Sequence, residues 1–232
     1  MAVREARQLV LGIAPPPAFG EEDFLPSSCN EAALAAVDAW PDWPDPALLL
    51  IGPRGAGKSH LAAIWAERAQ AVAIAAANLR VDDRLANLGD RPVLLEDAEG
   101  VTDEAAFFHL LNLVGERGSS LLVTARSAPE HWGFHLRDLL SRLRRAPAVE
   151  IRSPDDGLVR AVLVKLLLDR QLSPDEGTVE FVARRIERSL DAARRFVSRL
   201  DDEALSTGRR ISRSLASDVL KRLEREAAEN AP

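Results

Sequence analysis

Short apolar runs alternate with amphipathic segments over roughly the first two thirds of the chain. Apolar runs bounded by Gly, Pro or polar residues are typical of buried strands, whereas apolar residues spaced three or four apart are typical of helices. This pattern predicts strands at 47–51, 71–75, 91–97, 119–124 and 148–151. It predicts helices at 31–40, 60–68, 102–115 and 136–143. Strands that alternate with helices imply a parallel sheet with helices on both faces.

The pattern changes at Ser153, because only helical periodicity follows it. Ser153 with Pro154, and the run Ser173-Pro-Asp-Glu176, are typical of helix N-termini. Further helices are predicted at 155–170, 174–187, 190–205 and 214–228. We therefore predict an α/β fold, in which a five-stranded parallel sheet domain at residues 21–152 is followed by a small all-α lid domain at residues 153–232.

The first 20 residues follow neither pattern and are predicted to form a separate arm. The arm holds a short apolar peptide followed by Pro15-Pro-Pro17, which is stiff and incompatible with a helix. An apolar peptide before such a hinge can dock on another protein, with Gln8, Leu9 and Leu11 as candidate contact residues. The alternative is a strand that pairs with the body of the protein.

The strongest chemical signal is the segment Gly52-Pro-Arg-Gly-Ala-Gly-Lys-Ser59, which matches G-x-x-x-x-G-K-[ST] between a strand and a helix. Its glycines let several backbone N–H groups and a helix N-terminus face one point. We predict that Lys58 reaches the β- and γ-phosphates of a nucleotide and that the Ser59 hydroxyl holds Mg²⁺. The candidate nucleotide-binding residues are Gly52, Pro53, Arg54, Gly55, Ala56, Gly57, Lys58, Ser59 and His60.

Other candidate residues lie at strand ends and on helices. Glu96 and Asp97 end a buried strand, where an α/β sheet places its ligands, and we predict that they lie beside Mg²⁺ and water. Thr124 ends the next strand and is a candidate for orienting water. Arg142 and Arg194 are candidate phosphate ligands. From the residues alone, an ordinary strand-end threonine and surface arginines remain open alternatives.

Charge and cysteine content narrow the classes of partner. The net charge is −6, so the surface as a whole does not attract nucleic acid. The single cysteine, Cys29, excludes an intrachain disulfide, and no Cys/His set suggests a metal site. No apolar run is long enough to span a bilayer, and the N-terminus lacks a secretory signal. We therefore expect a cytoplasmic protein with no membrane partner.

The order of these motifs resembles the AAA+ ATPases of the DnaA branch. The matching stretches are 52–59, 93–97, Leu121-Leu-Val-Thr-Ala-Arg-Ser-Ala-Pro129, Leu139-Leu-Ser-Arg-Leu143 and Leu190-Asp-Ala-Ala-Arg-Arg-Phe-Val-Ser-Arg-Leu-Asp201. The resemblance implies that 52–59 is Walker A and 93–97 Walker B, with Thr124 as sensor I, Arg142 as an arginine finger and Arg194 as sensor II.

Within that branch, the peptide Gln8-Leu9-Val-Leu11 and the total length resemble the Hda family of DnaA-like regulators. This resemblance implies binding to the sliding clamp (the β subunit of DNA polymerase III) through Gln8, Leu9 and Leu11. It implies that Arg142 promotes hydrolysis of DnaA-bound ATP and so limits re-initiation of chromosome replication. The expected ligands are ADP or ATP with Mg²⁺, and self-association as a homo-oligomer is possible by the same resemblance. DnaA has a C-terminal helix-turn-helix domain that this sequence lacks, so we expect no sequence-specific DNA binding.

The Walker B stretch departs from the family pattern. The first acidic residue of the family motif is Asp, whereas this chain has Glu96 followed by Asp97. If Glu96 takes the metal position, Asp97 is a short-armed base. If Asp97 takes it, Ala98 leaves no base. Either register predicts nucleotide binding with a weak intrinsic ATPase at most. The alternatives are a helicase-loading or DNA-associated ATPase and a small-molecule P-loop kinase, and the all-α domain fits the kinase poorly.

Overall fold

The computed structural model describes residues 20–229 except 83, 84 and 86. The chain divides into two compact units, one ending at Ser153 and the other beginning at Pro154. Each unit has its own hydrophobic core, and each is described separately.

The first unit is built on a sheet of five parallel strands in the order β2-β3-β4-β1-β5. The strands are β1 (Ala47–Ile51), β2 (Val72–Ala75), β3 (Val93–Glu96), β4 (Leu121–Ala125) and β5 (Ala148–Glu150). The predicted fold class is confirmed. β1 has the predicted bounds, and the ends of the other four strands differ from the prediction by one or two residues, because an apolar run marks the buried part of a strand better than its ends.

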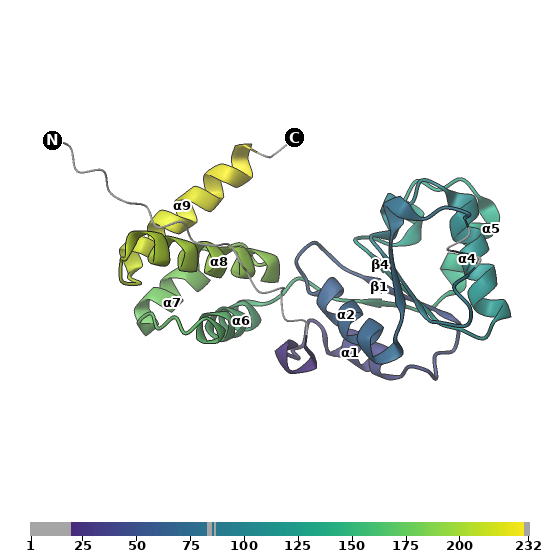
Figure 1. Ribbon diagram of the computed structural model, residues 1–232, viewed down its shortest axis with the longest axis horizontal. Coiled ribbons are helices and arrows are strands. Elements are labelled where there is room, and N and C mark those ends of the chain that lie inside the picture. Colours follow the sequence, from purple (N-terminus) through teal and green to yellow (C-terminus); the bar gives the residue numbers. More distant parts are fainter. Residues whose placement is uncertain (1–19, 83–84, 86, 230–232) are drawn as a thin grey trace. The chain divides into compact units, whose positions relative to one another are not determined.

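Helices cover both faces of this sheet (Figure 1). The helices α1 (Glu31–Asp38) and α2 (Lys58–Ala69) pack on one face, and α4 (Glu104–Glu116) and α5 (Arg137–Arg145) pack on the other. Successive side chains of a strand point to opposite faces of the sheet. Leu48 and Leu50 of β1 therefore pack in the core under α1 and α2, and Leu49 packs in the core under α4 and α5. Burial on both sides explains why β1, β3 and β4 are apolar runs rather than alternating patterns.

Short 3-10 helices complete the first unit. They are η1 (Glu21–Asp23), η2 (Ala76–Asn78), η3 (Ala98–Gly100) and η4 (Pro129–His131).

The position of α2 is fixed by tryptophans, because Trp65 stacks on Trp43 at 5.4 Å between ring centroids and meets Trp40 edge-on at 6.1 Å. Aromatic pairs of this kind add stability beyond the area that they bury.

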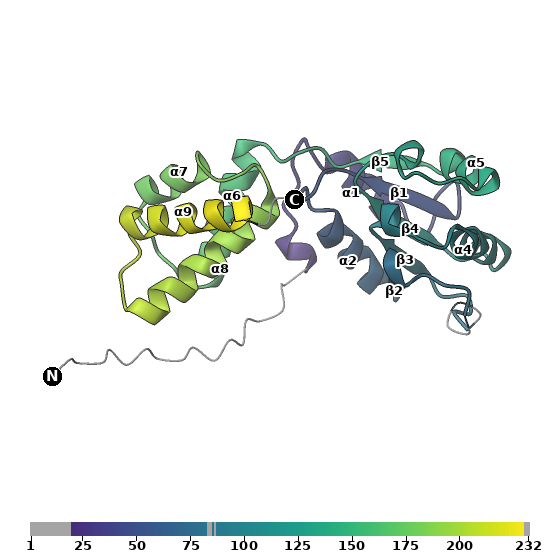
Figure 2. The same ribbon diagram turned by 90° about the horizontal axis from the view of Figure 1, so that it is seen from above.

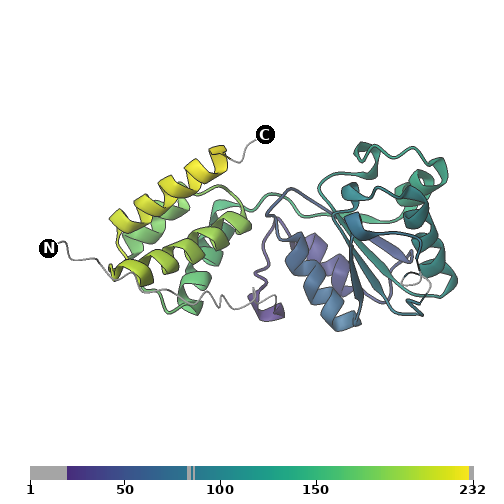
Figure 3. The ribbon, with the colours of Figure 1, turned by 45° about the horizontal axis from the view of Figure 1, so that its top comes forward.

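The second unit contains α6 (Asp156–Asp169), α7 (Glu176–Ala183), α8 (Leu190–Thr207) and α9 (Arg213–Glu229) (Figures 2 and 3). Its buried core residues all come from these helices, with Leu163, Phe196 and Leu215 among them. α8 begins at Leu190 as predicted, whereas α6 and α7 begin one and two residues later than predicted. Asp155 caps α6 and Asp175 caps α7 through side-chain bonds to backbone N–H groups, whereas Ser153 and Ser173 lie two residues earlier. A carboxylate at the N-cap also interacts favourably with the helix dipole.

Within the residues that the structure describes, no helix combines the length and apolar character needed to cross a membrane.

Candidate functional site

The loop Gly52–Gly57 leaves β1 at the carboxyl edge of the sheet. The strand β1 lies between β4 and β5, so its loop emerges between two neighbouring strands. The connection after β1 crosses one face of the sheet through α2, while the connection from β4 to β5 crosses the other through α5. Adjacent strands whose connections leave in opposite directions open a crevice at their carboxyl ends, which is where α/β sheets bind ligands.

The backbone of this loop needs glycine at several positions. Gly55 and Gly57 have φ of 73° and 110°, a region that L side chains rarely adopt. At Gly52 the requirement is space, since a Cβ atom there would lie 2.2 Å from the Ile151 carbonyl oxygen. Pro53, Arg54 and Ser59 are exposed, while Ala56 is buried. The loop therefore presents backbone and short side chains at the start of α2.

Lys58 is the first residue of α2, and its side chain turns back into the loop. Its Nζ donates hydrogen bonds to the Gly52 carbonyl at 2.7 Å and the Pro53 carbonyl at 3.0 Å. Only 7% of the residue is exposed. Burial lowers the pKa of the ammonium group, and the carboxylates of Asp97 and Glu99 oppose that change. A buried cation in a ring of backbone carbonyls is suited to receive an anion.

The two carboxylates predicted from the sequence, Glu96 and Asp97, lie at the carboxyl end of β3, which pairs with β4. Glu96 ends β3, and burial followed by the charge of Asp97 raises its pKa. Asp97 adopts a left-handed conformation with φ of 54°, and its backbone N–H donates to Thr124 Oγ1 at 3.1 Å. Thr124 is buried at the end of β4. The structure thus brings the strand-end threonine into direct contact with the second acid of the pair.

Two charged residues beside these carboxylates were not among the sequence candidates. Glu99, in η3, accepts a hydrogen bond from the Arg126 backbone N–H at 3.3 Å and forms an ion pair with its Nε at 3.3 Å. Both residues act electrostatically on Lys58, Glu99 raising its pKa and Arg126 lowering it. Their signal in the sequence is positional, because each lies within three residues of a strand end at the carboxyl edge.

The donor set fits a magnesium nucleotide. Among the described residues no three or more His, Cys, Asp or Glu side chains form a metal cage. Mg²⁺ usually needs no such cage, since it binds through one or two carboxylates together with substrate phosphates and water. The Ser59 hydroxyl, Glu96 and Asp97 are the oxygen donors predicted for that role, and Asp97 is close enough to act electrostatically on Lys58.

Solved structures share this fold at low sequence identity. Domain III of the Thermotoga maritima replication initiation protein DnaA aligns with a TM-score of 0.79 and 18% identity, over 89% of this chain and 97% of that chain. AMPPCP-bound DnaA from Aquifex aeolicus aligns with a TM-score of 0.68 and 16% identity, over 92% and 71%. The Thermotoga maritima RuvB Holliday junction branch migration motor aligns at 0.67 and 15%, over 87% and 71%. This chain therefore shares the fold of DnaA domain III and of the RuvB motor. No protein-family model matches the sequence, and no curated protein matches it either.

In this fold, the remaining sequence candidates lie away from the loop or in the second unit. Arg142 is exposed in the last turn of α5, with its Cζ atom 5.2 Å from the Phe108 ring centroid. Arg194 is half-buried on α8 of the second unit. Gln8, Leu9 and Leu11 lie outside the described residues.

The His60 side chain contacts the segment before α1, for which the sequence predicts no helix or strand. Its Nε2 lies 3.1 Å from the Gly20 carbonyl oxygen, and its ring meets Phe24 edge-on at 5.4 Å. The imidazole therefore packs the segment before α1 against the start of α2. A phenylalanine in a Pro-rich loop gives no periodic signal, so this contact was not predicted.

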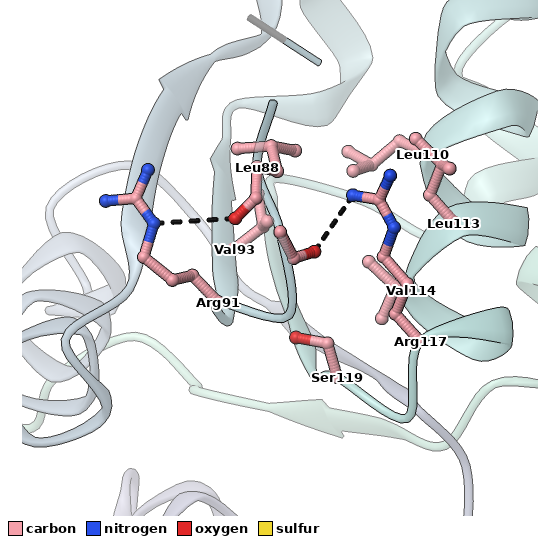
Figure 4. Close-up of a pocket in the computed structure, with 9 residues that line it drawn as sticks. Leu88, Arg91, Val93, Leu110, Leu113, Val114, Arg117 and Ser119 are labelled. Atoms are coloured by element: carbon pink, nitrogen blue, oxygen red, sulfur yellow. Dashed lines mark hydrogen bonds between the residues drawn. The ribbon is translucent and has the colours of Figure 1, made fainter. Parts of the chain in front are cut away.

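A separate hollow lies at the amino-terminal edge of the sheet (Figure 4). It is lined by Leu88, Gly89, Arg91, Val93, Leu110, Leu113, Val114, Arg117 and Ser119. Arg91 and Arg117 donate to the carbonyl oxygens of Leu88 and Gly89. Since Val93 begins β3 and the loop at Gly52 follows the end of β1, the hollow and the candidate site are at opposite ends of the strands.

Proposed function

We propose that this protein binds ADP or ATP with Mg²⁺ through the loop 52–59 and acts as a regulatory AAA+ protein of the Hda type. The observation that carries the proposal is the buried Lys58 ammonium group, held by two loop carbonyls at the carboxyl edge of a DnaA-like sheet. Two of its three N–H donors are used by Gly52 and Pro53, and a third is available for a phosphate oxygen. The AMPPCP carried by DnaA of Aquifex aeolicus supports a nucleotide as the ligand.

Different residues of this chain are proposed to bind the phosphates, to hold Mg²⁺ and to orient water. Backbone N–H groups of 52–59 and Lys58 bind the phosphates, while Ser59 and Glu96 hold Mg²⁺, which neutralises phosphate charge when bound. Thr124 fixes the backbone of Asp97, so that Asp97 is the carboxylate placed to orient water. Its side chain is one methylene shorter than a glutamate, which supports weak intrinsic hydrolysis.

The regulatory step is assigned to Arg142. A guanidinium group carries a permanent planar charge, and an arginine supplied in trans accelerates GTP hydrolysis by about 10³- to 10⁵-fold in known systems. Arg142 is exposed, so it is accessible to a partner's nucleotide. We propose that the partner is DnaA carrying ATP, and that Gln8, Leu9 and Leu11 tether the protein to the sliding clamp. Arg194 is proposed to respond to the protein's own nucleotide, and possible homo-oligomers would use the same exposed arginine.

The deciding experiment measures ATP turnover by DnaA in the presence of clamp loaded on DNA. Wild-type protein should stimulate turnover. The Arg142→Ala variant and the Gln8→Ala/Leu9→Ala double variant should each lose the stimulation, while Arg137→Ala, an exposed arginine on the same helix, should keep it. If wild type gives no stimulation, and single-stranded DNA instead raises hydrolysis by this protein alone, the helicase-loading or DNA-associated ATPase takes the place of the regulator.

A further inference from the structure

Helix α5, which carries Arg142, begins without a capping side chain of its own. Its N-cap residue is Leu136, whose side chain cannot accept a hydrogen bond. Glu104, the first residue of α4, binds the backbone N–H groups of Leu136 and of the residue before it, and so holds the chain where it enters α5. Its carboxylate oxygens accept from His135 N at 2.9 and 3.0 Å and from Leu136 N at 2.6 Å.

The environment of Glu104 favours the ionised carboxylate, which is the form that accepts these hydrogen bonds best. Burial alone would raise its pKa, but the N–H donors of Leu136 and His135 outweigh burial and lower it. An ionised acceptor makes stronger hydrogen bonds than a neutral one, and negative charge is favourable at a helix N-terminus. The His135 ring adds Nδ1 at 3.6 Å from Glu104 Oε1, although its side chain is 94% exposed.

The same helix α4 also contacts the other end of α5. Phe108 follows Glu104 by one helical turn, so the two side chains lie on one face of α4. The Arg142 guanidinium group lies over the Phe108 ring. Leu139 and Leu143 of α5 are buried in the same core as α4. α5 is therefore held on α4 at its start by Glu104, along its buried face by leucines, and at Arg142 itself by an aromatic ring.

We infer that Glu104 is a positioning residue for Arg142, setting through the start of α5 the place at which the guanidinium group meets a partner's nucleotide. The inference rests on the proposed function of Arg142. A displacement of about 1 Å in a catalytic group can cost roughly 100-fold in rate, so a small shift of α5 is enough to matter. Glu104 contacts neither nucleotide nor partner in this scheme.

The test uses the full-length protein and DnaA ATP turnover with clamp on DNA, comparing Glu104→Ala, Glu104→Gln, Arg142→Ala and the Glu104→Ala/Arg142→Ala double variant. Glu104→Ala should lower the maximal stimulated rate by about 10-fold or more, while the protein concentration for half-maximal stimulation stays within about two-fold. Glu104→Gln keeps a carbonyl acceptor and should retain a larger share of the stimulation. In the Arg142→Ala background, Glu104→Ala should have no further effect.

The matched control is Glu116→Ala, an exposed glutamate at the other end of α4. It should keep the stimulation, and Glu104→Ala alone should speed hydrogen exchange at the Leu136 amide. Equal loss in Glu116→Ala, or a further loss in the double variant, would overturn the positioning role. Loss in Arg142→Ala with full stimulation by Glu104→Ala would also overturn it and leave the proposed function intact. Full stimulation by Arg142→Ala would instead overturn the proposed function.

Discussion

Nucleotide binding at the candidate site depends most on the Lys58 side chain. Replacing it by Ala removes a buried cation and two hydrogen bonds to the loop. It also removes the one charged hydrogen bond proposed to reach a phosphate. Because such a bond contributes about 1.5–3 kcal/mol, we expect ADP and ATP affinity to fall on the order of 10- to 100-fold. Titration with a fluorescent nucleotide checks this. Lys165→Ala, a lysine paired with Asp169 on α6, is the control and should bind as wild type does. Equal affinity of both variants would refute the phosphate-binding role.

Gly52 and Gly115 give opposite predictions for the same substitution. A Cβ at Gly52 would collide with the Ile151 carbonyl oxygen, so Gly52→Ala should destabilise the protein by about 2 kcal/mol or more. Gly115 lies exposed in α4, where an added methyl group would meet no atom within 4 Å beyond the helix's own backbone. Gly115→Ala should therefore stabilise the protein by roughly 0.5–1 kcal/mol. Urea unfolding measures both. A stable Gly52→Ala protein would mean that the strand end and the segment after β5 are not in close contact.

Glu96 makes stability depend on pH. Burial and the neighbouring Asp97 raise its pKa, while the unfolded chain has the ordinary value. The folded protein therefore binds this proton more tightly, so ionisation of Glu96 lowers stability as the pH rises from the ordinary carboxyl value through the folded-state pKa. Without nucleotide, Glu96→Gln should be more stable than wild type at pH 8, and the gain should shrink as pH falls through the raised pKa to below the ordinary carboxyl value.

Urea unfolding at several pH values between 4 and 8 measures this gain. Glu150→Gln, exposed at the end of β5, is the matched control and should not show the trend. A gain for Glu96→Gln that is the same at pH 4 and pH 8 would contradict the account.

At the scale of single elements, Asp103 determines where α4 begins. Its side chain accepts a hydrogen bond from Ala106 N at 3.0 Å. Asp103→Ala should cost about 1 kcal/mol in the free energy of unfolding, and Asp103→Asn, which keeps the acceptor, should cost less. The exposed Asp42→Ala outside a helix should stay within about 0.5 kcal/mol of wild type. Equal losses for Ala and Asn would show that charge, not capping, is what α4 requires.

The same scale shows what could be predicted from the sequence. The strands β1, β3 and β4 are buried on both faces and appear as uninterrupted apolar runs, so they were found together with the α/β class. The edge strands β2 and β5 have exposed positions and were also predicted. The helix starts were less certain, since Ser153 and Ser173 carry the same capping signal as Asp155 and Asp175 two residues later. The side chain nearest a free N–H group decides between them, and a one-dimensional pattern does not contain that distance.

Contacts between distant elements lie beyond such patterns. Glu104 binds His135 and Leu136, which are 31 and 32 residues away, and nothing in its local sequence distinguishes it from an ordinary first-turn glutamate. The pairing of Glu99 with Arg126 has the same character. The loop 52–59 was predictable because its chemistry is local. The roles assigned to Thr124, Arg142 and Arg194 came from the resemblance, and they remain predictions.

At the scale of the whole molecule, the separate cores predict that the second unit folds without the first. All the buried residues of its core lie on α6, α7, α8 and α9, and α6 and α9 each pack on both α7 and α8. A fragment of residues 154–232 should therefore be helical by circular dichroism and should unfold cooperatively. A single core of this size supplies about 3–5 kcal/mol at most, so the transition should be broad.

Truncation of the fragment's central side chain makes this prediction stringent. Phe196 is 1% exposed, and Phe196→Ala should cost about 3–5 kcal/mol, enough to abolish the transition altogether. The exposed Arg225→Ala should leave it unchanged. If the wild-type fragment has helical content but no cooperative transition, its core is incomplete without residues of the first unit. Cooperative unfolding that Phe196→Ala removes and Arg225→Ala preserves would establish the second unit as an independent folding unit.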